Sequence, residues 1–480
     1  MLKFIIGTAG TGKSRYICDR IVHLAQQGEK CLLLIPEQFS KTAEAMIFSS
    51  LDNTQSNLVE VFSFTSLMRD VNTNHIRLVT TPLTEAGKAV LARRAVDNVK
   101  KKRDMYSKQS NNFGFSFNLA STFDDLKRSG ISGEVFYSLA QNAPAKSAKL
   151  KELALIYAEY CGLMGDKFCD EEDLLEKLAE VLPHSYTHDT HIFIDSFESF
   201  SYGQLQIIAR MLSLAKEVSI ALTCDSLYDT TNGTGNFSFV QNTAGQIIRT
   251  AKKLDIDILP PVVLTDSHRF KNCDIAAVDE FLLGEVADNS ENSHVFVTEF
   301  ENQHSEVTFA VAKINQLIQQ GYSYNDIAVV CPQLDKYEHQ LQESFALAAI
   351  PYFIDTNRII SSCAPVVLVK SILNIMSDGL NGENILSLLK TGLTNYDDDT
   401  ISSLENYLYV WQDYDFDLSQ PFMLSPAGLK PEIEEGEKEI VAQIDIIRCE
   451  LWEIFSAVNN GQQDVAENLL KKCYEIMRLR

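Results

Sequence analysis

Short apolar runs alternate with helical periods over the first part of the chain. Residues 3–6, 31–35 and 58–63 are rich in large apolar side chains, which is typical of strands buried in a parallel sheet. A segment with helical spacing follows each run. This alternation predicts an α/β core with a doubly wound parallel sheet. Ligands of such a core bind beyond the carboxyl ends of the strands.

The pattern changes at about residue 80 and changes back at about residue 178. Between these positions the apolar residues follow helical periods, which predicts a helical insertion. Strand-like runs return at residues 191–195 and 218–223. We therefore expect the same sheet to continue after the insertion.

A second, smaller α/β domain is predicted after a polar linker at residues 284–293. Its helices are expected at residues 306–320 and 337–347, the first with Ser305 as N-cap and Gly321 just past its end. Its predicted strands are three short apolar runs, at residues 295–297, 327–331 and 352–354.

The first predicted strand runs directly into a glycine-rich loop and a helix, in the pattern G-x-x-x-x-G-K-S. Glycines let a turn point its backbone N–H groups at phosphate oxygens, and the following helix adds a partial positive charge. In this pattern the lysine reaches the β- and γ-phosphates and the serine hydroxyl binds Mg²⁺. We therefore predict ATP and Mg²⁺ binding by the loop residues Gly7, Thr8, Ala9, Gly10, Thr11, Gly12, Lys13 and Ser14.

A second nucleotide signature is the apolar run at residues 191–194 that ends in Asp195. An aspartate at the tip of a strand beside a phosphate-binding loop orients the Mg²⁺ shell. Many buried strands end in aspartate, so the signal gains weight only together with the loop. The predicted metal pair is Ser14 and Asp195.

The net charge of −23 over 480 residues excludes a protein whose whole surface grips nucleic acid. It leaves room for a local basic channel, because phosphate contacts depend on where the cations lie. No apolar run approaches a membrane span and no signal peptide is evident, so we expect no membrane association and a cytoplasmic location. The ten cysteines are scattered singly, which favours reduced thiols over a metal site or disulfides. The chain ends inside a helical pattern, and we expect it to be part of something longer.

Candidate contacts to single-stranded DNA lie near the expected strand tips and in the most basic stretch. Aromatic rings at strand tips can stack on bases, although packing in the core is the commoner use of such rings. A basic run can contact phosphates, although a solvated surface is its commoner use. The candidates are Gln38, Phe39, Phe62, Ser63, Phe64, Lys100, Lys101, Lys102 and Arg103.

The segment at residues 194–200 resembles a motif of superfamily 1 helicases of the UvrD/Rep type, with key positions replaced. The resemblance implies that Asp195 is the metal aspartate and that Ser196 replaces the glutamate that polarises the attacking water. A serine hydroxyl is a poor base, so hydrolysis is expected to be slow or absent. Cys331 stands where the resemblance implies an arginine for the γ-phosphate, and the chain starts without room for an adenine-reading segment.

The combination resembles the N-terminal half of AddB (RexB) subunits of bacterial AddAB helicase–nucleases. The residues that carry the resemblance are 7–14, 35–39 (Ile-Pro-Glu-Gln-Phe), 61–64, 193–198 and, most specifically, 350–358 (Ile-Pro-Tyr-Phe-Ile-Asp-Thr-Asn-Arg). Thr356, Asn357 and residues 361–363 depart from the more charged or histidine-containing pattern of the family.

This resemblance implies a helicase-like body that has lost motor function, with an AddA-type partner supplying the active motor. It also implies binding of DNA ends and single strands for recombinational repair, and reading of a recombination hotspot. The family's nuclease domain and its four-cysteine Fe–S cluster lie downstream of residue 480, so neither is expected here.

The predicted fold is a P-loop (RecA-like) α/β domain with a helical insertion, followed by a second RecA-like domain and a helical region. The boundaries are residues 1–79 with 178–283 for the first domain, 80–177 for the insertion, 284–365 for the second domain and 366–480 for the helical region, which is expected to be truncated. Three alternatives stay open: an active superfamily 1 DNA helicase, a P-loop small-molecule kinase, and a scaffold that keeps the loop as a relic.

Overall fold

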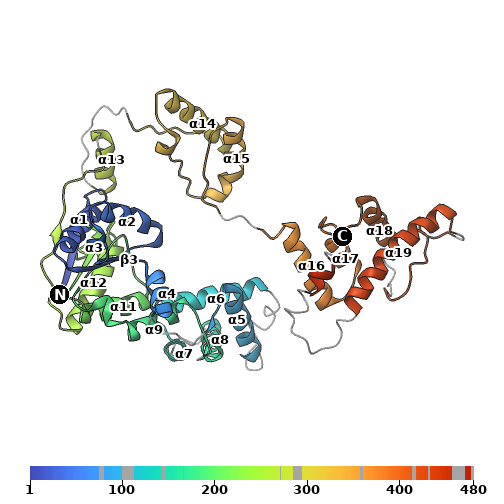
Figure 1. Ribbon diagram of the computed structural model, residues 1–480, viewed down its shortest axis with the longest axis horizontal. Coiled ribbons are helices and arrows are strands. Elements are labelled where there is room, and N and C mark those ends of the chain that lie inside the picture. Colours follow the sequence, from blue (N-terminus) through green and yellow to red (C-terminus); the bar gives the residue numbers. More distant parts are fainter. Residues whose placement is uncertain are drawn as a thin grey trace. The chain divides into compact units, whose positions relative to one another are not determined.

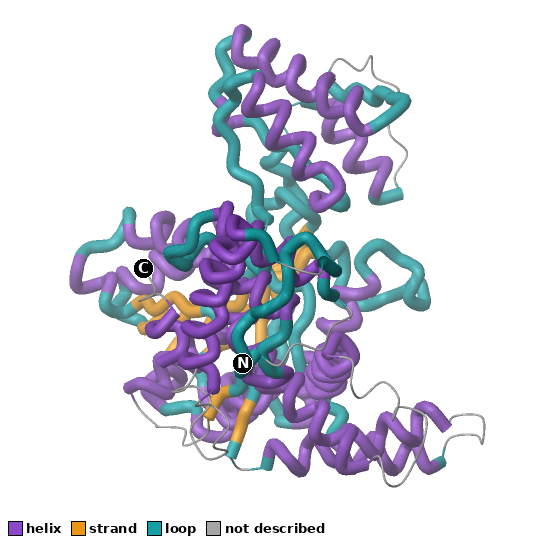
Figure 2. Tube along the Cα trace, turned by 90° about the vertical axis from the view of Figure 1, so that its right-hand side faces the viewer, coloured by secondary structure: helices purple, strands orange, loops and turns teal. Residues whose placement is uncertain are grey.

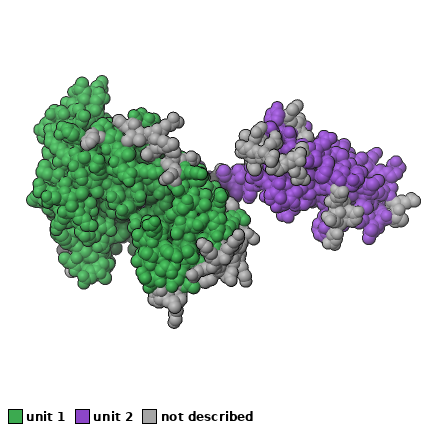
Figure 3. Space-filling view, turned by 90° about the horizontal axis from the view of Figure 1, so that it is seen from below, with its two compact units in different colours: residues 1–297 green, residues 298–480 purple. Residues whose placement is uncertain are grey.

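The computed structural model divides the chain into two compact units, residues 1–297 and 298–480 (Figures 1 and 3). The residues described are 1–74, 81–99, 113–142, 148–165, 167–270, 272–284, 294–356, 360–412, 418–430, 433–456 and 471–476. The finer division into four parts stays a prediction.

A six-stranded parallel sheet forms the centre of the first unit, in the order β3-β2-β6-β7-β1-β8. All five strands that the sequence predicts for this sheet are present, and the two-residue strand β8 is an addition. The strands are β1 (Leu2–Gly7), β2 (Lys30–Leu34), β3 (Val59–Phe62), β6 (Thr190–Ile194), β7 (Glu217–Thr223) and β8 (Val262–Val263). The α/β class is therefore confirmed, and the parallel sheet is consistent with a RecA-like fold.

Helices cover both faces of this sheet, because successive side chains of each strand point to opposite faces. On one face Ile5, Leu33 and Phe193 pack with α1 (Lys13–Gln26) and α2 (Ser40–Phe48). On the other face Phe4, Leu34 and Ile192 pack with α4 (Phe64–Asn74), α9 (Glu171–Val181), α11 (Tyr202–Leu214) and α12 (Ser238–Lys253). Figure 2 shows the strands packed among helices. Shorter helices in the first unit are η1 (Glu37–Phe39), α3 (Asn53–Ser56), α10 (His184–Thr187) and α13 (Cys273–Leu282).

The predicted helical insertion contains α5 (Glu85–Val99), α6 (Phe113–Arg128), α7 (Gly133–Gln141) and α8 (Ala148–Met164). These helices share a core around Phe123, Tyr157 and Tyr160. The sequence predicts no strand here, yet β4 (Thr81–Pro82) pairs in parallel with β5 (Phe168–Cys169). Two residues are too few for a periodic signal, and tertiary contact brings the two ends of the insertion together.

In the first part of the second unit, the predicted helices form but the predicted strands do not. The helices are α14 (Gln303–Gln319), η3 (Tyr324–Asp326) and α15 (Leu334–Leu347). Among the described residues, the runs at 295–297, 327–331 and 352–354 carry no strand pairing. The prediction of Ser305 as N-cap is also wrong, because the side chain of Asn302 accepts the N–H of Ser305. Gly321 does follow the helix, with φ +96°.

The remainder of the second unit is helical, as the sequence predicts. It contains α16 (Ala364–Asp378), α17 (Gly382–Leu389), α18 (Asp398–Val410) and α19 (Glu435–Ser456). Their apolar faces meet in one core, which includes Ile372, Leu388, Tyr407 and Ile444.

Candidate functional site

The glycine-rich loop joins the end of β1 to the start of α1, at the carboxyl edge of the sheet. Gly10 and Gly12 both have φ +85°, a left-handed conformation that glycine adopts without steric cost. A Cβ on Gly7 would lie 2.4 Å from Thr11 Oγ1 and 2.5 Å from the carbonyl oxygen of Leu264. The glycines at these positions are therefore required by the fold of the loop itself.

Lys13 lies at the first turn of α1 and folds back over the loop. Its Nζ donates to the carbonyl oxygens of Gly7 (2.8 Å) and Thr8 (2.7 Å). Burial lowers the pKa of Lys13, the charges of Asp195 and Cys224 oppose this, and the guanidinium of Arg269 lowers it further. The lysine is thus held close to a second cation and to a carboxylate.

One cavity of about 840 Å³ brings together the loop and the tip of β6. Lys13, Ser14 and Asp195 all line it. Asp195 follows β6 directly, is buried, and its N–H donates to the carbonyl oxygen of Leu34 (3.0 Å). The residues predicted as a metal pair therefore face the same space, as their positions at neighbouring strand ends require.

Ser196, the residue after Asp195, is exposed in the cavity and has φ +63°. A left-handed conformation is uncommon for serine and is often found at functional sites. The exposed carboxylate of Glu198 lines the same cavity, two residues further on. The sequence interpretation centred on Ser196 and did not consider Glu198 as an acid or base.

His268 and Arg269 also line the cavity, and no sequence motif pointed to them. The parallel pairing of β8 with β1 carries the chain back to the loop, where the N–H of His268 donates to the carbonyl oxygen of Gly10 (2.9 Å). A Cβ on Gly10 would lie 2.7 Å from Cβ of Arg269. The site therefore has an arginine close to the loop, although Cys331 occupies the position from which the sequence analysis expected one.

The family model described as "ADDB, N-terminal" matches residues 4–279, which include the loop, Asp195 and Arg269. The chain belongs to this family.

Curated relatives that match most of this AddB-family chain are named as a subunit of an ATP-dependent helicase/deoxyribonuclease. The protein of Clostridium botulinum (strain Hall) is 28% identical, over 99% of this chain and 43% of its own length. That of Clostridioides difficile (strain 630) is 28% identical, over 92% of this chain and 40% of its own length. The chain thus spans less than half the length of these relatives.

The DNA candidates of this AddB-family chain separate into two groups. Gln38 and Phe39 line the cavity, and the ring of Phe39 is 43% exposed. Ser63 and Phe64 are buried: Ser63 Oγ bonds Ser66 Oγ (3.0 Å), and Phe64 packs edge-on against Phe197 and Phe200. Phe62 is half-buried against Tyr186. Lys100, Lys101, Lys102 and Arg103 lie outside the described residues.

Phe64 therefore has the core role that the sequence left open as the alternative to base stacking. No helix in the described part of the chain is long and apolar enough to span a bilayer.

Proposed function

We propose that this chain is the helicase-like part of a subunit that processes DNA ends, and that it binds Mg-ATP and single-stranded DNA. The observation that carries the proposal is the shared cavity of the glycine-rich loop, Asp195 and Arg269. Names of the relatives associate the family with an ATP-dependent helicase and deoxyribonuclease. Recombinational repair of double-strand ends is the role that fits both.

The residues present suit a nucleotide triphosphate with its metal. Gly7 and Gly10 leave room where a Cβ would collide, so phosphate oxygens can approach the backbone. Lys13 and Arg269 would bind phosphate oxygens, and Ser14 with Asp195 would hold Mg²⁺. When bound, the metal would screen the phosphate charge.

We further propose that hydrolysis is slow, so that nucleotide acts as a structural or regulatory ligand. The support is Ser196, which cannot act as a general base at neutral pH. The active helicase is the second candidate, favoured by Glu198 and Arg269 in the cavity. A carboxylate and a phosphate-facing arginine are the groups that hydrolysis needs.

A binding titration and a turnover assay separate these two functions. We expect Mg-ATP to bind the wild-type chain and Lys13→Ala to weaken binding about 10- to 100-fold, the effect of losing a charge-assisted contact. Lys30→Ala, an exposed lysine on β2, is the matched control. Absence of ATP binding in the wild type would leave the scaffold alternative.

Steady-state ATPase with and without single-stranded DNA then tests the motor. DNA-stimulated turnover on the order of 1 s⁻¹ or faster, lost in Glu198→Gln, would contradict the slow-hydrolysis proposal and establish the second candidate. Turnover unchanged in Glu198→Gln would exclude that residue as the base.

DNA binding is tested by fluorescence anisotropy with a labelled single strand over a salt series. Affinity should fall steeply with salt, by about 0.7 log units per log unit of salt for each phosphate contacted. Phe39→Ala should cost about 1–3 kcal/mol if the ring stacks on a base. Met46→Ala, an exposed apolar residue on α2 outside the cavity, is the control. Phe39→Ala must leave ATP affinity unchanged, because the ring also faces the nucleotide cavity.

The partner and the setting belong to the same proposal. The relatives are named as one subunit of a larger enzyme, which supports a heterodimer with an AddA-type helicase–nuclease subunit. Reading of a recombination hotspot and a cytoplasmic location complete the proposal. A nuclease centre and an Fe–S cluster are expected only in longer relatives, beyond the part that matches this chain.

A further inference from the structure

Two extended segments of the second unit expose apolar side chains without strand partners. In the segment at residues 327–331, Val329 is 45% and Val330 89% exposed. In the segment at residues 350–355, Tyr352 is 45% and Phe353 87% exposed. Side chains of this kind are typical of strands that are covered on both faces. Their exposure indicates that something else normally covers them.

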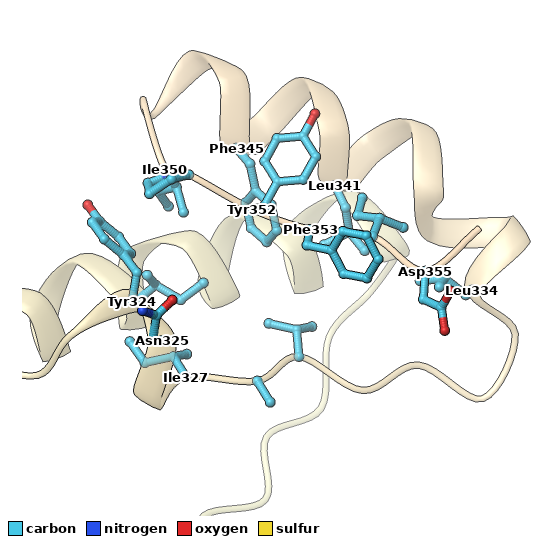
Figure 4. A pocket seen from close by; sticks show the side chains of 15 residues that line it. Tyr324, Asn325, Ile327, Leu334, Leu341, Phe345, Ile350, Tyr352, Phe353 and Asp355 are labelled. Atoms are coloured by element: carbon cyan, nitrogen blue, oxygen red, sulfur yellow. The ribbon is translucent and has the colours of Figure 1, made fainter. Parts of the chain in front are cut away.

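A groove of about 610 Å³ separates these two segments (Figure 4). Its floor is apolar and buried, and consists of Ile314, Leu341, Phe345 and Ile350. We call this space the strand groove. Figure 4 shows the extended chain of Ile350 to Asp355 along one wall and that of Ile327 along the other.

The backbone on both walls is unused. Ala328, Val329 and Val330 make no backbone hydrogen bond to another described residue, and neither do Pro351, Tyr352 and Phe353. Each wall therefore presents free N–H and C=O groups, apart from the missing N–H of Pro351. Unpaired strand edges are templates for another strand. A strand between them would form hydrogen bonds on both sides and bury the floor.

We propose that the strand groove accepts a β-strand from the polypeptide that AddB relatives carry beyond the matched region. The matched family region is N-terminal, and this chain covers 43% of the C. botulinum relative, so that relative has further chain after it. The inserted strand would complete a sheet whose outer strands are residues 327–331 and 350–355. Its composition would be apolar and β-branched or aromatic on the side facing the floor. The inference does not depend on the nucleotide site.

The test uses fluorescein-labelled overlapping peptides of about 12 residues, roughly twice the usual strand length. They cover the part of the C. botulinum relative that follows the matched region. Anisotropy measures their binding to the 480-residue chain, and hydrogen exchange with mass spectrometry reports on its backbone. We expect at least one peptide with alternating apolar residues to bind and to slow amide exchange at residues 327–331 and 350–355 about 10-fold or more.

Three variants identify the mode of binding. Phe353→Asp removes an apolar contact, and Val329→Pro removes a ladder N–H without removing an existing backbone bond. Both should weaken binding about 10-fold or more, the effect of about 1.4 kcal/mol. Leu347→Asp is the matched control, because this residue is 83% exposed and does not line the groove. Circular dichroism of each variant verifies that the chain is folded.

Two outcomes would overturn the proposal. If no peptide slows exchange at the two segments, the groove does not take a strand from this source. If exchange there is already slow in the chain alone and becomes faster on dilution, with a dimer seen by light scattering, a second copy covers the groove. Binding that is weakened equally by all three variants would also contradict pairing in the groove.

Discussion

Gly10 and Gly28 have almost the same backbone conformation but different surroundings. Their φ angles are +85° and +82°, yet a Cβ on Gly10 would lie 2.7 Å from Cβ of Arg269, and one on Gly28 would have nothing within 4 Å. Left-handed backbone costs an alanine about 1–2 kcal/mol. The two glycines therefore separate the cost of the conformation from the cost of crowding the site.

We expect Gly10→Ala and Gly28→Ala both to lower the free energy of unfolding, the first by more. Only Gly10→Ala should weaken Mg-ATP binding, because it displaces Arg269 from the loop. Urea unfolding and ATP titration of both variants provide the measurements. Equal effects on ATP affinity would mean that the contact between Gly10 and Arg269 plays no part in binding.

A second prediction at the residue scale concerns pH. The pKa of Lys13 is lowered, chiefly by burial, and the lysine binds phosphate only when protonated. ATP affinity should therefore be complete at neutral pH and decline as pH rises through a midpoint below the ordinary 10.5. Arg269→Ala removes one cause of the lowered pKa, so it should move this midpoint upward while reducing affinity.

ATP titrations between neutral and alkaline pH, in wild type and Arg269→Ala, measure the midpoint. Arg15→Ala is the control, because this exposed arginine also lines the cavity but does not lower the pKa of Lys13. A midpoint that moves downward in Arg269→Ala would refute the assigned electrostatic coupling.

At the scale of elements, a buried ion cluster joins the helical insertion to the α/β unit. Lys127 of α6 binds Asp170, the N-cap of α9, and Asp173, the third residue of that helix, whose Oδ1 lies 2.8 Å from Nζ. The side chains of Lys127 and Asp170 are 12% and 3% exposed. Removing one partner of a buried pair leaves the other charges uncompensated, which is strongly destabilising.

We expect Lys127→Met to lower the free energy of unfolding by about 3–5 kcal/mol at neutral pH. Without the lysine, burial and mutual repulsion would raise the pKa of both carboxyls above their unfolded values. Groups raised in this way favour the folded state at low pH and lose that effect as pH rises. The deficit relative to wild type should therefore shrink as pH falls to about 5.

Urea unfolding at both pH values tests this. Lys216→Met, which breaks an exposed pair with Glu29, should cost about 0–1 kcal/mol. A deficit in Lys127→Met as small as that of the control would show that the cluster contributes nothing to the docking of α6 on α9.

At the scale of the whole molecule, all residues that line the nucleotide cavity belong to the first unit. We expect a chain of residues 1–297 to bind Mg-ATP with an affinity within about threefold of the 480-residue chain, a difference below 1 kcal/mol. Isothermal titration of both chains, with Lys13→Ala in each as the control, measures this. A much weaker affinity in the shorter chain would mean that residues 298–480 contribute to the site.

The sequence by itself determined the features that are encoded within a few residues. The glycine-rich loop and Asp195 could be predicted because conformation and chemistry there depend on adjacent residues, and the five predicted strands of the sheet because apolar runs of that length must be buried. Only tertiary structure placed Arg269 and His268 beside Gly10, since the parallel pairing of β8 with β1 joins segments about 250 residues apart. It also decided that Phe64 belongs to the core and that Glu198 reaches the cavity. Residues 327–331 and 352–354 have strand composition without pairing, because a strand exists only where another strand accepts its hydrogen bonds.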